Sequence, residues 1–123
     1  MEPSVDLLAI ETGLSALDAD VTLWRLRGHL DAVTVRSLEA DFDREVKAGH
    51  VRWVVNLEGL EYISSAGLGS FIGVLSELRS RGGGIVFMGL SPKIGKIFGM
   101  LGFTRVFRVV VSEAEAVASF RGV

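Results

Sequence analysis

The sequence predicts an α/β domain in which strands and helices alternate in the order ββαβαβαβα. Short apolar runs rich in β-branched residues alternate with amphipathic runs in which apolar residues recur every three or four positions. Serines and glycines stand at most of the boundaries between these runs. The 123 residues include 49% hydrophobic residues and no cysteine, so a core can form without disulfides. We expect one domain over residues 1–123, with a mixed sheet of about five strands covered by about four helices.

The first half of the chain predicts two strands, a helix and a third strand. The strands are expected at residues 5–11 and 20–28, joined by the turn-forming segment 12–19. The spacing of Val35, Leu38, Phe42 and Val46 predicts an amphipathic helix that ends near Gly49 and is capped by Asp31 or Thr34. Residues 51–57, "VRWVVNL", then predict a central strand.

The second half predicts a further helix, a strand, a helix, a last strand and a short helix. After the paired serines, a helix starting near Ala66 is expected to bury the stripe Leu68, Phe71, Ile72, Leu75 and Leu78 and to stop at Gly82 to Gly84. The strand 85–89 follows, and Ser91 with Pro92 predicts a helix start. That helix is expected to bury Ile94, Ile97, Phe98 and Leu101 and to stop at Gly102. Residues 105–111 predict the last strand, and Ser112 with Glu115 predicts a capping box for a helix that carries Val117 and Phe120 inward.

Composition argues against several classes of function. A net charge of −2, with 13 Lys and Arg spread along the chain, gives no basic stripe, so nucleic acid is not an expected partner. His29 and His50 in a chain without cysteine make a poor ligand set, and neither a metal nor a cofactor is expected. No apolar run approaches the roughly 20 residues of a membrane-spanning helix, and the N-terminus lacks a signal-peptide pattern. We expect a cytoplasmic protein that does not insert into a membrane.

Residues 89–97, "GLSPKIGKI", have some features of a phosphate-binding P-loop. Five residues rather than four separate Gly89 from Gly95, and Ile97 stands where a serine or threonine would hold magnesium. Pro92 also removes a backbone donor. The segment therefore predicts an ordinary capped helix with solvated lysines.

A serine hydrolase is a second enzymatic alternative. The Gly-x-Ser-x-Gly elbow is absent, because Ile63 occupies the first glycine position when Ser65 is taken as the nucleophile. His29 and Asp31 would reach the serines only if the segment "GHLD" ended a neighbouring strand. We do not expect an enzyme.

The position of Ser64 and Ser65 favours modification of a serine. At a helix N-terminus, unpaired backbone N–H groups and the helix dipole accept a phosphate without refolding the domain. Gly67 and Gly69 are expected to leave the backbone open to a close-fitting partner. From the residues alone, a plain N-cap serine without a partner remains the alternative.

A family resemblance bears on this choice. Residues 54–71, "VVNLEGLEYISSAGLGSF", preceded by "LRGHLD" and followed by residues 81–109, resemble the STAS-domain anti-sigma factor antagonists of bacteria, also called anti-anti-sigma factors. That family pairs a "G-x-L-D" turn with a "D-S-x-G-L" loop. The loop serine is phosphorylated by an anti-sigma factor serine/threonine kinase and dephosphorylated by a PP2C-type phosphatase. Aligned on Gly67 and Leu68, the phospho-acceptor is Ser65.

The resemblance, which covers nearly the whole chain, implies a partner-switching regulator built as a single STAS domain. Unphosphorylated, it would bind the kinase and release the sigma factor, and phosphorylation on Ser65 would switch binding off. The implied partner-binding residues lie in the turn, the loop and the outward small face of the following helix: Asp31, Ser64, Ala66, Gly67, Leu68, Gly69, Gly73 and Ser76. For Gly73 and Ser76, close packing within the domain is the alternative.

The sequence departs from the family pattern at three places. Ser64 replaces the aspartate that usually precedes the phospho-acceptor, Ala66 replaces a frequent second serine, and His29 replaces a frequent glutamate in the turn. Loss of the aspartate removes a charge that tunes kinase recognition or the environment of the phosphate. It leaves open an alternative, a STAS scaffold module of another signalling or lipid-transport complex without a phosphorylation cycle.

Overall fold

A computed structural model describes residues 7–122 and contains one five-stranded sheet with the strand order β1-β2-β3-β4-β5. β1 and β2 form an antiparallel hairpin, and the other neighbouring pairs are parallel. The predicted mixed sheet and the predicted order of elements are confirmed. The strands are β1 (Leu8–Ser15), β2 (Asp18–Leu30), β3 (Arg52–Ile63), β4 (Gly84–Met88) and β5 (Arg108–Val110).

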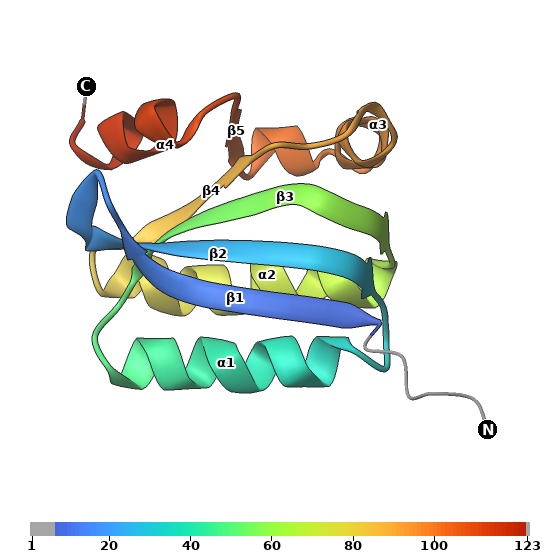
Figure 1. Ribbon diagram of the computed structural model, residues 1–123, viewed down its shortest axis with the longest axis horizontal. Helices are drawn as coiled ribbons and strands as arrows, with labels where there is room; N and C mark the ends of the chain where they lie inside the picture. The colour runs from blue at the N-terminus through green and yellow to red at the C-terminus, as the bar shows by residue number, and fades with distance from the viewer. Residues whose placement is uncertain (1–6, 123) are drawn as a thin grey trace.

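Helices cover both faces of the sheet. Figure 1 shows α1 and α2 beneath the sheet and α4 above it. Each parallel connection passes through a helix, as the crossover between parallel strands requires. The helices are α1 (Val35–Lys47), α2 (Ser65–Ser80), α3 (Pro92–Met100) and α4 (Glu113–Phe120), with a single 3₁₀ turn, η1 (Phe103–Arg105), before β5.

Three of the four helices begin at a serine cap, as the sequence predicts. In each case the cap residue has extended backbone and its hydroxyl accepts a backbone N–H three residues later, which satisfies one free donor of the first turn. The pairs are Ser64 with Gly67 at 3.3 Å, Ser91 with Ile94 at 3.2 Å, and Ser112 with Glu115 at 3.1 Å.

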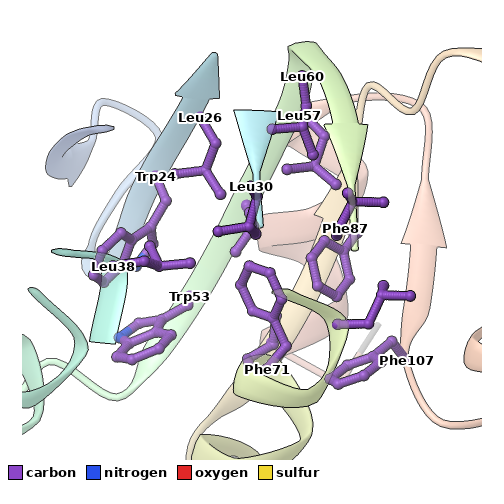
Figure 2. Close-up of a cluster of buried hydrophobic side chains, with 14 of the residues drawn as sticks. Trp24, Leu26, Leu30, Leu38, Trp53, Leu57, Leu60, Phe71, Phe87 and Phe107 are labelled. Carbon is purple, nitrogen blue, oxygen red and sulfur yellow. The ribbon is translucent and has the colours of Figure 1, made fainter. Parts of the chain in front are cut away.

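The main core lies between the sheet and the helices α1 and α2 (Figure 2). It is largely aromatic: the ring centroids of Trp24 and Trp53 are 4.8 Å apart, and those of Phe71 and Phe87 are 4.9 Å apart in an edge-to-face arrangement. Such pairs stabilise beyond the area that they bury. α4 covers a smaller cluster on the opposite face, made of Val21, Val54, Val86, Met88, Ala116 and Val117.

The third strand is longer than predicted. β3 continues to Ile63 because β2 continues beside it as far as Leu30, and the two residues pair at the end of the ladder. The register shifts between Arg25 and Arg27 and again between Gly28 and His29. Such irregularities break the alternation of apolar and polar residues by which a strand is recognised. The residues between the predicted strand 51–57 and the serines therefore belong to β3.

The other strand boundaries also differ. The turn between β1 and β2 is only residues 16–17, since both strands extend into the segment predicted as a turn. Residues 5 and 6 of the first predicted strand lie outside the described residues. β5 is shorter than the predicted 105–111, because η1 includes Arg105 and a turn at residues 106–107 follows it before the strand begins.

Two predicted core residues are exposed. Ile72 on α2 is 45% exposed, because it lies one position beyond the buried stripe of Leu68, Phe71 and Leu75. Leu101 is 58% exposed because α3 ends before it. Ile94 and Phe98 are fully buried as predicted.

Candidate functional site

The site lies at the edge of the sheet where β2 and β3 end side by side. Leu30 pairs with Ile63, and the backbone N–H of Ser64 donates to the carbonyl of Leu30 at 2.9 Å. The turn that begins at Asp31 and the helix that begins after Ser64 therefore start next to each other. The carboxyl ends of parallel strands are where α/β sheets commonly place binding residues.

Ser64 has a structural role as the N-cap of α2. Its backbone is extended, its hydroxyl accepts the N–H of Gly67 at 3.3 Å, and its carbonyl accepts the N–H of Leu68 at 3.0 Å. Aspartate and serine are both favoured N-caps, so serine preserves the cap while removing a negative charge.

Ser65 is the first residue of α2 and its side chain is exposed. In the part of the chain that the structure describes, its hydroxyl makes no hydrogen bond. It stands at the positive end of the helix dipole, beside backbone N–H groups that the first turn leaves without intrahelical partners. A modifying enzyme can thus reach this hydroxyl without unfolding the domain.

Asp31 organises the turn beside the serines. Its Oδ1 accepts the backbone N–H groups of Val33 at 2.9 Å and Thr34 at 3.0 Å. These bonds, first that from Thr34, hold the pKa of the Asp31 carboxyl below its usual value of 3.8. Within residues 7–122 the hydrogen bonds to this carboxylate all go to Oδ1, which leaves Oδ2 available to a partner.

The same turn decides how α1 begins. Thr34 occupies the N-cap of α1, but its hydroxyl makes no cap bond to that helix. It donates to the carbonyl of His29 at 2.8 Å and accepts the N–H of Asp31 at 2.9 Å. Both residues that the sequence offered as caps therefore bond within the turn and hold it rigidly against the end of β2.

Two of the expected partner-binding residues face inward. Leu68 is 2% exposed and belongs to the main core, so its side chain is unavailable at the surface. Gly67 is also buried, and a Cβ there would lie 2.7 Å from Cγ of Leu30. The expectation that Gly67 keeps the backbone open to a partner is therefore wrong, because this glycine is required for α2 to pack on β2.

The remaining expected residues of α2 lie at the surface. Gly69, Gly73 and Ser76 are exposed, and Ala66 is half-buried. A Cβ at Gly69 or Gly73 would meet nothing within 4 Å, so packing within the domain does not require either glycine. The close-packing alternative for Gly73 is thus ruled out for the described residues.

Asp31 also lines a hollow of about 410 Å³. The other residues that line it were not assigned to the partner-binding site from the sequence: His29, Glu61, Tyr62 and Lys93. Nε2 of His29 lies 3.5 Å from Oε1 of Glu61. The pairing of His29 with Tyr62 depends on the register between β2 and β3, which are neighbours in the sheet but far apart in the chain. No local sequence pattern therefore indicates it. For Lys93 the sequence contains a weak indication of this position. Lys93 stands at the start of a predicted helix that follows a parallel strand, and such a helix begins at the carboxyl ends of the strands, where Asp31 and the serines also lie.

The segment "GHLD" does end β2 beside β3, as the hydrolase alternative requires, but within residues 7–122 neither enzymatic alternative gains a catalytic contact. Ser91 is an ordinary cap, with its hydroxyl bound to the N–H of Ile94 at 3.2 Å, and Lys93 and Lys96 are exposed. Across residues 7–122, no hydrogen bond joins His29 to either serine of the pair.

Among the described residues, 7–122, no helix combines the length and apolar character that crossing a membrane demands.

The family can be decided by comparison. The family model described as the STAS domain matches residues 16–116, which span the four strands β2 to β5 and the first half of α4. The chain belongs to the STAS domain family.

Two bacterial relatives of this STAS domain are named as regulators. BtrV of Bordetella bronchiseptica, assigned as an anti-sigma factor antagonist, is 35% identical over 96 residues, which cover 78% of this chain and 83% of BtrV. The anti-sigma-B factor antagonist of Staphylococcus aureus is 33% identical over 85 residues, which cover 69% of this chain and 79% of that protein. The resemblance stated from the sequence is confirmed.

Solved structures share the fold. An anti-sigma factor antagonist from Mycobacterium paratuberculosis matches with a TM-score of 0.82 at 19% identity, covering 96% of this chain and 97% of that one. The unphosphorylated form of the anti-sigma factor antagonist SpoIIAA matches with a TM-score of 0.77 at 24% identity, covering 94% and 98%. At these identities the likeness establishes the STAS fold.

Proposed function

We propose that this protein is a cytoplasmic anti-sigma factor antagonist that is switched by phosphorylation of Ser65. The unphosphorylated form binds an anti-sigma factor serine/threonine kinase and thereby releases a sigma factor. Phosphorylation of Ser65 by that kinase ends the interaction, and a PP2C-type phosphatase restores it. The protein acts as a regulator and not as an enzyme.

The observation that carries this proposal is the division of roles between the two adjacent serines. Ser64 uses its hydroxyl to cap α2, whereas Ser65 presents an exposed hydroxyl on the first turn of that helix. A phosphate on Ser65 is stabilised locally by the N–H groups and dipole of the helix, so the domain stays folded in both states.

The chemistry of the surroundings explains why phosphorylation would release the partner. Phosphate adds about 1.5 to 2 negative charges and three strong acceptors to a surface that already holds the ionised Asp31. A partner surface shaped to approach a small hydroxyl closely loses contact, and any acidic group on it is repelled. Asp31, Ser64, Ala66 and Gly69 lie around Ser65 and form the proposed contact region, with Gly73 and Ser76 farther along α2.

The names of the relatives support the same function. BtrV and the S. aureus relative are described as antagonists of anti-sigma factors. The Bacillus protein SpoIIAA has been solved in a phosphorylated form, which matches this chain with a TM-score of 0.67 at 24% identity. The loss of the usual aspartate at Ser64 keeps one alternative open, a STAS scaffold that works without phosphorylation.

The decisive experiment starts by co-purifying the tagged protein from its native cells and identifying a bound kinase and any phosphopeptide by mass spectrometry. With the purified kinase and ATP, the wild type and Ser64→Ala should both gain phosphate on Ser65. Ser65→Ala should gain none and stay bound. Phosphate mapped to Ser64 would contradict the assignment, and no phosphate on either serine with an active kinase would favour the scaffold.

Calorimetry with the same kinase tests the contact region. Asp31→Lys should weaken binding by more than about tenfold, or about 1.4 kcal/mol, because it reverses the charge that a basic partner residue meets. Circular dichroism checks that this variant stays folded. Unchanged affinity of a folded Asp31→Lys would remove Asp31 from the interface.

A further inference from the structure

A groove of about 520 Å³ runs between α1 and α2 on the side of the molecule away from the sheet. The two helices cover the same face of the sheet (Figure 1). The lining of the groove includes Phe42, Gly69 and Gly73, which we call the floor, and the carboxylates of Glu39, Asp43 and Glu77, which we call the rim; Ser70 also lines it. Ala66, which follows Ser65, lies at one end of the groove.

The floor contains two glycines that packing within the domain does not require. Glycine is unfavourable inside a helix, yet α2 has glycine at positions 69 and 73, both facing the groove. A Cβ at either position would meet nothing within 4 Å, in contrast to Gly67, which touches Leu30. The bare backbone at these positions allows a second polypeptide to approach α2 closely.

The rim has a negative charge that is only partly compensated. Among the described residues, neither lysine nor arginine lines the groove. Glu39 and Asp43 lie one turn apart on α1, where like charges repel, and neither forms an ion pair in the part of the chain that the structure describes. Glu77 pairs with Arg81 of its own helix at 3.1 Å, and both side chains are half exposed.

We propose that the groove seats an amphipathic helix of the anti-sigma kinase, with apolar residues on the Gly69 and Gly73 floor and lysine or arginine residues against Glu39, Asp43 and Glu77. The proposal deepens the function given above and rests on it for the identity of the partner. A groove between two helices with small residues at its floor suits a third helix. The acidic rim selects a basic occupant.

Ala66 brings one end of this docking site beside Ser65, whereas the end at Gly73 lies away from the serine switch. Gly73 lies eight residues beyond Ser65 on α2, or roughly 12 Å along the helix axis. Sites more than about 7–10 Å apart with no shared partners contribute additively. A substitution at the Gly73 end should therefore weaken kinase binding by the same factor whether or not Ser65 carries phosphate.

The test measures dissociation constants of the purified kinase, held with a non-hydrolysable ATP analogue, for the full chain in its unphosphorylated and phosphorylated forms. Gly73→Gln, which fills the floor, and Asp43→Lys, which reverses a rim charge, should each weaken both forms by about tenfold. The effect of Asp43→Lys should shrink as salt is raised from 0.05 to about 0.5 M.

Two matched controls sit outside the groove. Gly99→Gln introduces the same side chain into α3 at a glycine whose Cβ also meets nothing within 4 Å. Asp20→Lys makes the same charge change at the opposite end of β2 from Asp31. Both should bind within about twofold of wild type, which separates groove contacts from general electrostatic steering. Circular dichroism and urea unfolding confirm that every variant is folded.

The outcomes distinguish this proposal from the one that it rests on. If phosphorylation abolishes binding but folded Gly73→Gln and Asp43→Lys bind like wild type, the groove proposal is wrong and the switch stands. If the groove variants weaken binding while phosphate on Ser65 has no effect, the docking site stands and the switch fails. If sedimentation shows a dimer that Gly73→Gln dissociates, with kinase affinity unchanged, the groove holds a second copy and the proposal is overturned.

Discussion

Replacing Gly67 with alanine is expected to destabilise the domain, even though alanine favours a helix. A Cβ at this position would lie 2.7 Å from Cγ and 3.1 Å from the carbonyl oxygen of Leu30. Leu30 is fully buried, and its carbonyl accepts the N–H of Ser64 at 2.9 Å. Neither atom can move without disturbing the core or the start of α2.

The magnitude follows from two opposed effects. Overpacking a filled core costs about 1–3 kcal/mol, and the gain in helix propensity is about 1 kcal/mol, so the net loss should be up to about 2 kcal/mol. Gly69→Ala gives the matched comparison two residues away, because its Cβ meets nothing within 4 Å. That variant should gain up to about 1 kcal/mol.

Urea unfolding followed by circular dichroism measures both variants. The expected order of the free energy of unfolding is Gly69→Ala above wild type and wild type above Gly67→Ala. In a thermal scan, each 1 kcal/mol should shift the Tm by roughly 4 °C in a domain of this size. If Gly67→Ala proved as stable as Gly69→Ala, the inferred contact between α2 and the end of β2 would be refuted.

Three further predictions concern the serines and Asp31. Ser64→Ala should lower the free energy of unfolding by about 1 kcal/mol, because it removes the hydroxyl that caps the N–H of Gly67. Ser65→Ala should change that free energy by less than about 0.5 kcal/mol. Equal losses for the two variants in urea unfolding would contradict the division of roles between the serines. The carboxyl of Asp31 should titrate below 3.8 by NMR, because the N–H groups of Thr34 and Val33 stabilise its charged form. Since this pKa is lowered on folding, its contribution to stability is present above pH 3.8 and is lost as the pH falls through the folded value; a pKa at or above 3.8 would argue against the turn. Phosphorylation of Ser65 should shift amide resonances mainly in residues 63–70 and around Asp31, and shifts spread through β3 and α3 would instead indicate a global rearrangement.

The sequence alone predicted the helix starts that depend on a cap residue and its near neighbours. Ser91 followed by Pro92 predicts the start of α3, and its hydroxyl makes the expected cap bond. Ser112 behaves in the same way at α4, where Val117 is buried as predicted. These signals are reliable because a cap bond joins residues only three positions apart, so the sequence alone contains both partners.

The motif around Ser65 could also be recognised in the sequence, and it indicated the STAS family that the comparisons establish. The roles of the residues next to Ser65 could not be predicted from the sequence. Gly67 and Gly69 look equivalent in the sequence, yet Gly67 packs on Leu30 while Gly69 lies on an open surface. The difference arises because residues two positions apart on a helix point in different directions, and only the placement of α2 on β2 decides which direction is buried.

The tertiary structure alone decided what gathers at the end of the sheet. The β2 and β3 register brings Leu30 beside Ile63, and so places Asp31 next to Ser64 and His29 opposite Tyr62. Pairing with β2 extends β3 to Ile63, and two register shifts in that ladder interrupt the alternation of apolar and polar residues by which a strand is predicted. The packing of α1 beside α2 likewise brings Glu39 and Asp43 to the rim of the same groove as Gly73. Each of these contacts joins residues far apart in the chain, and their energies depend on pairing and packing that no short stretch of sequence contains.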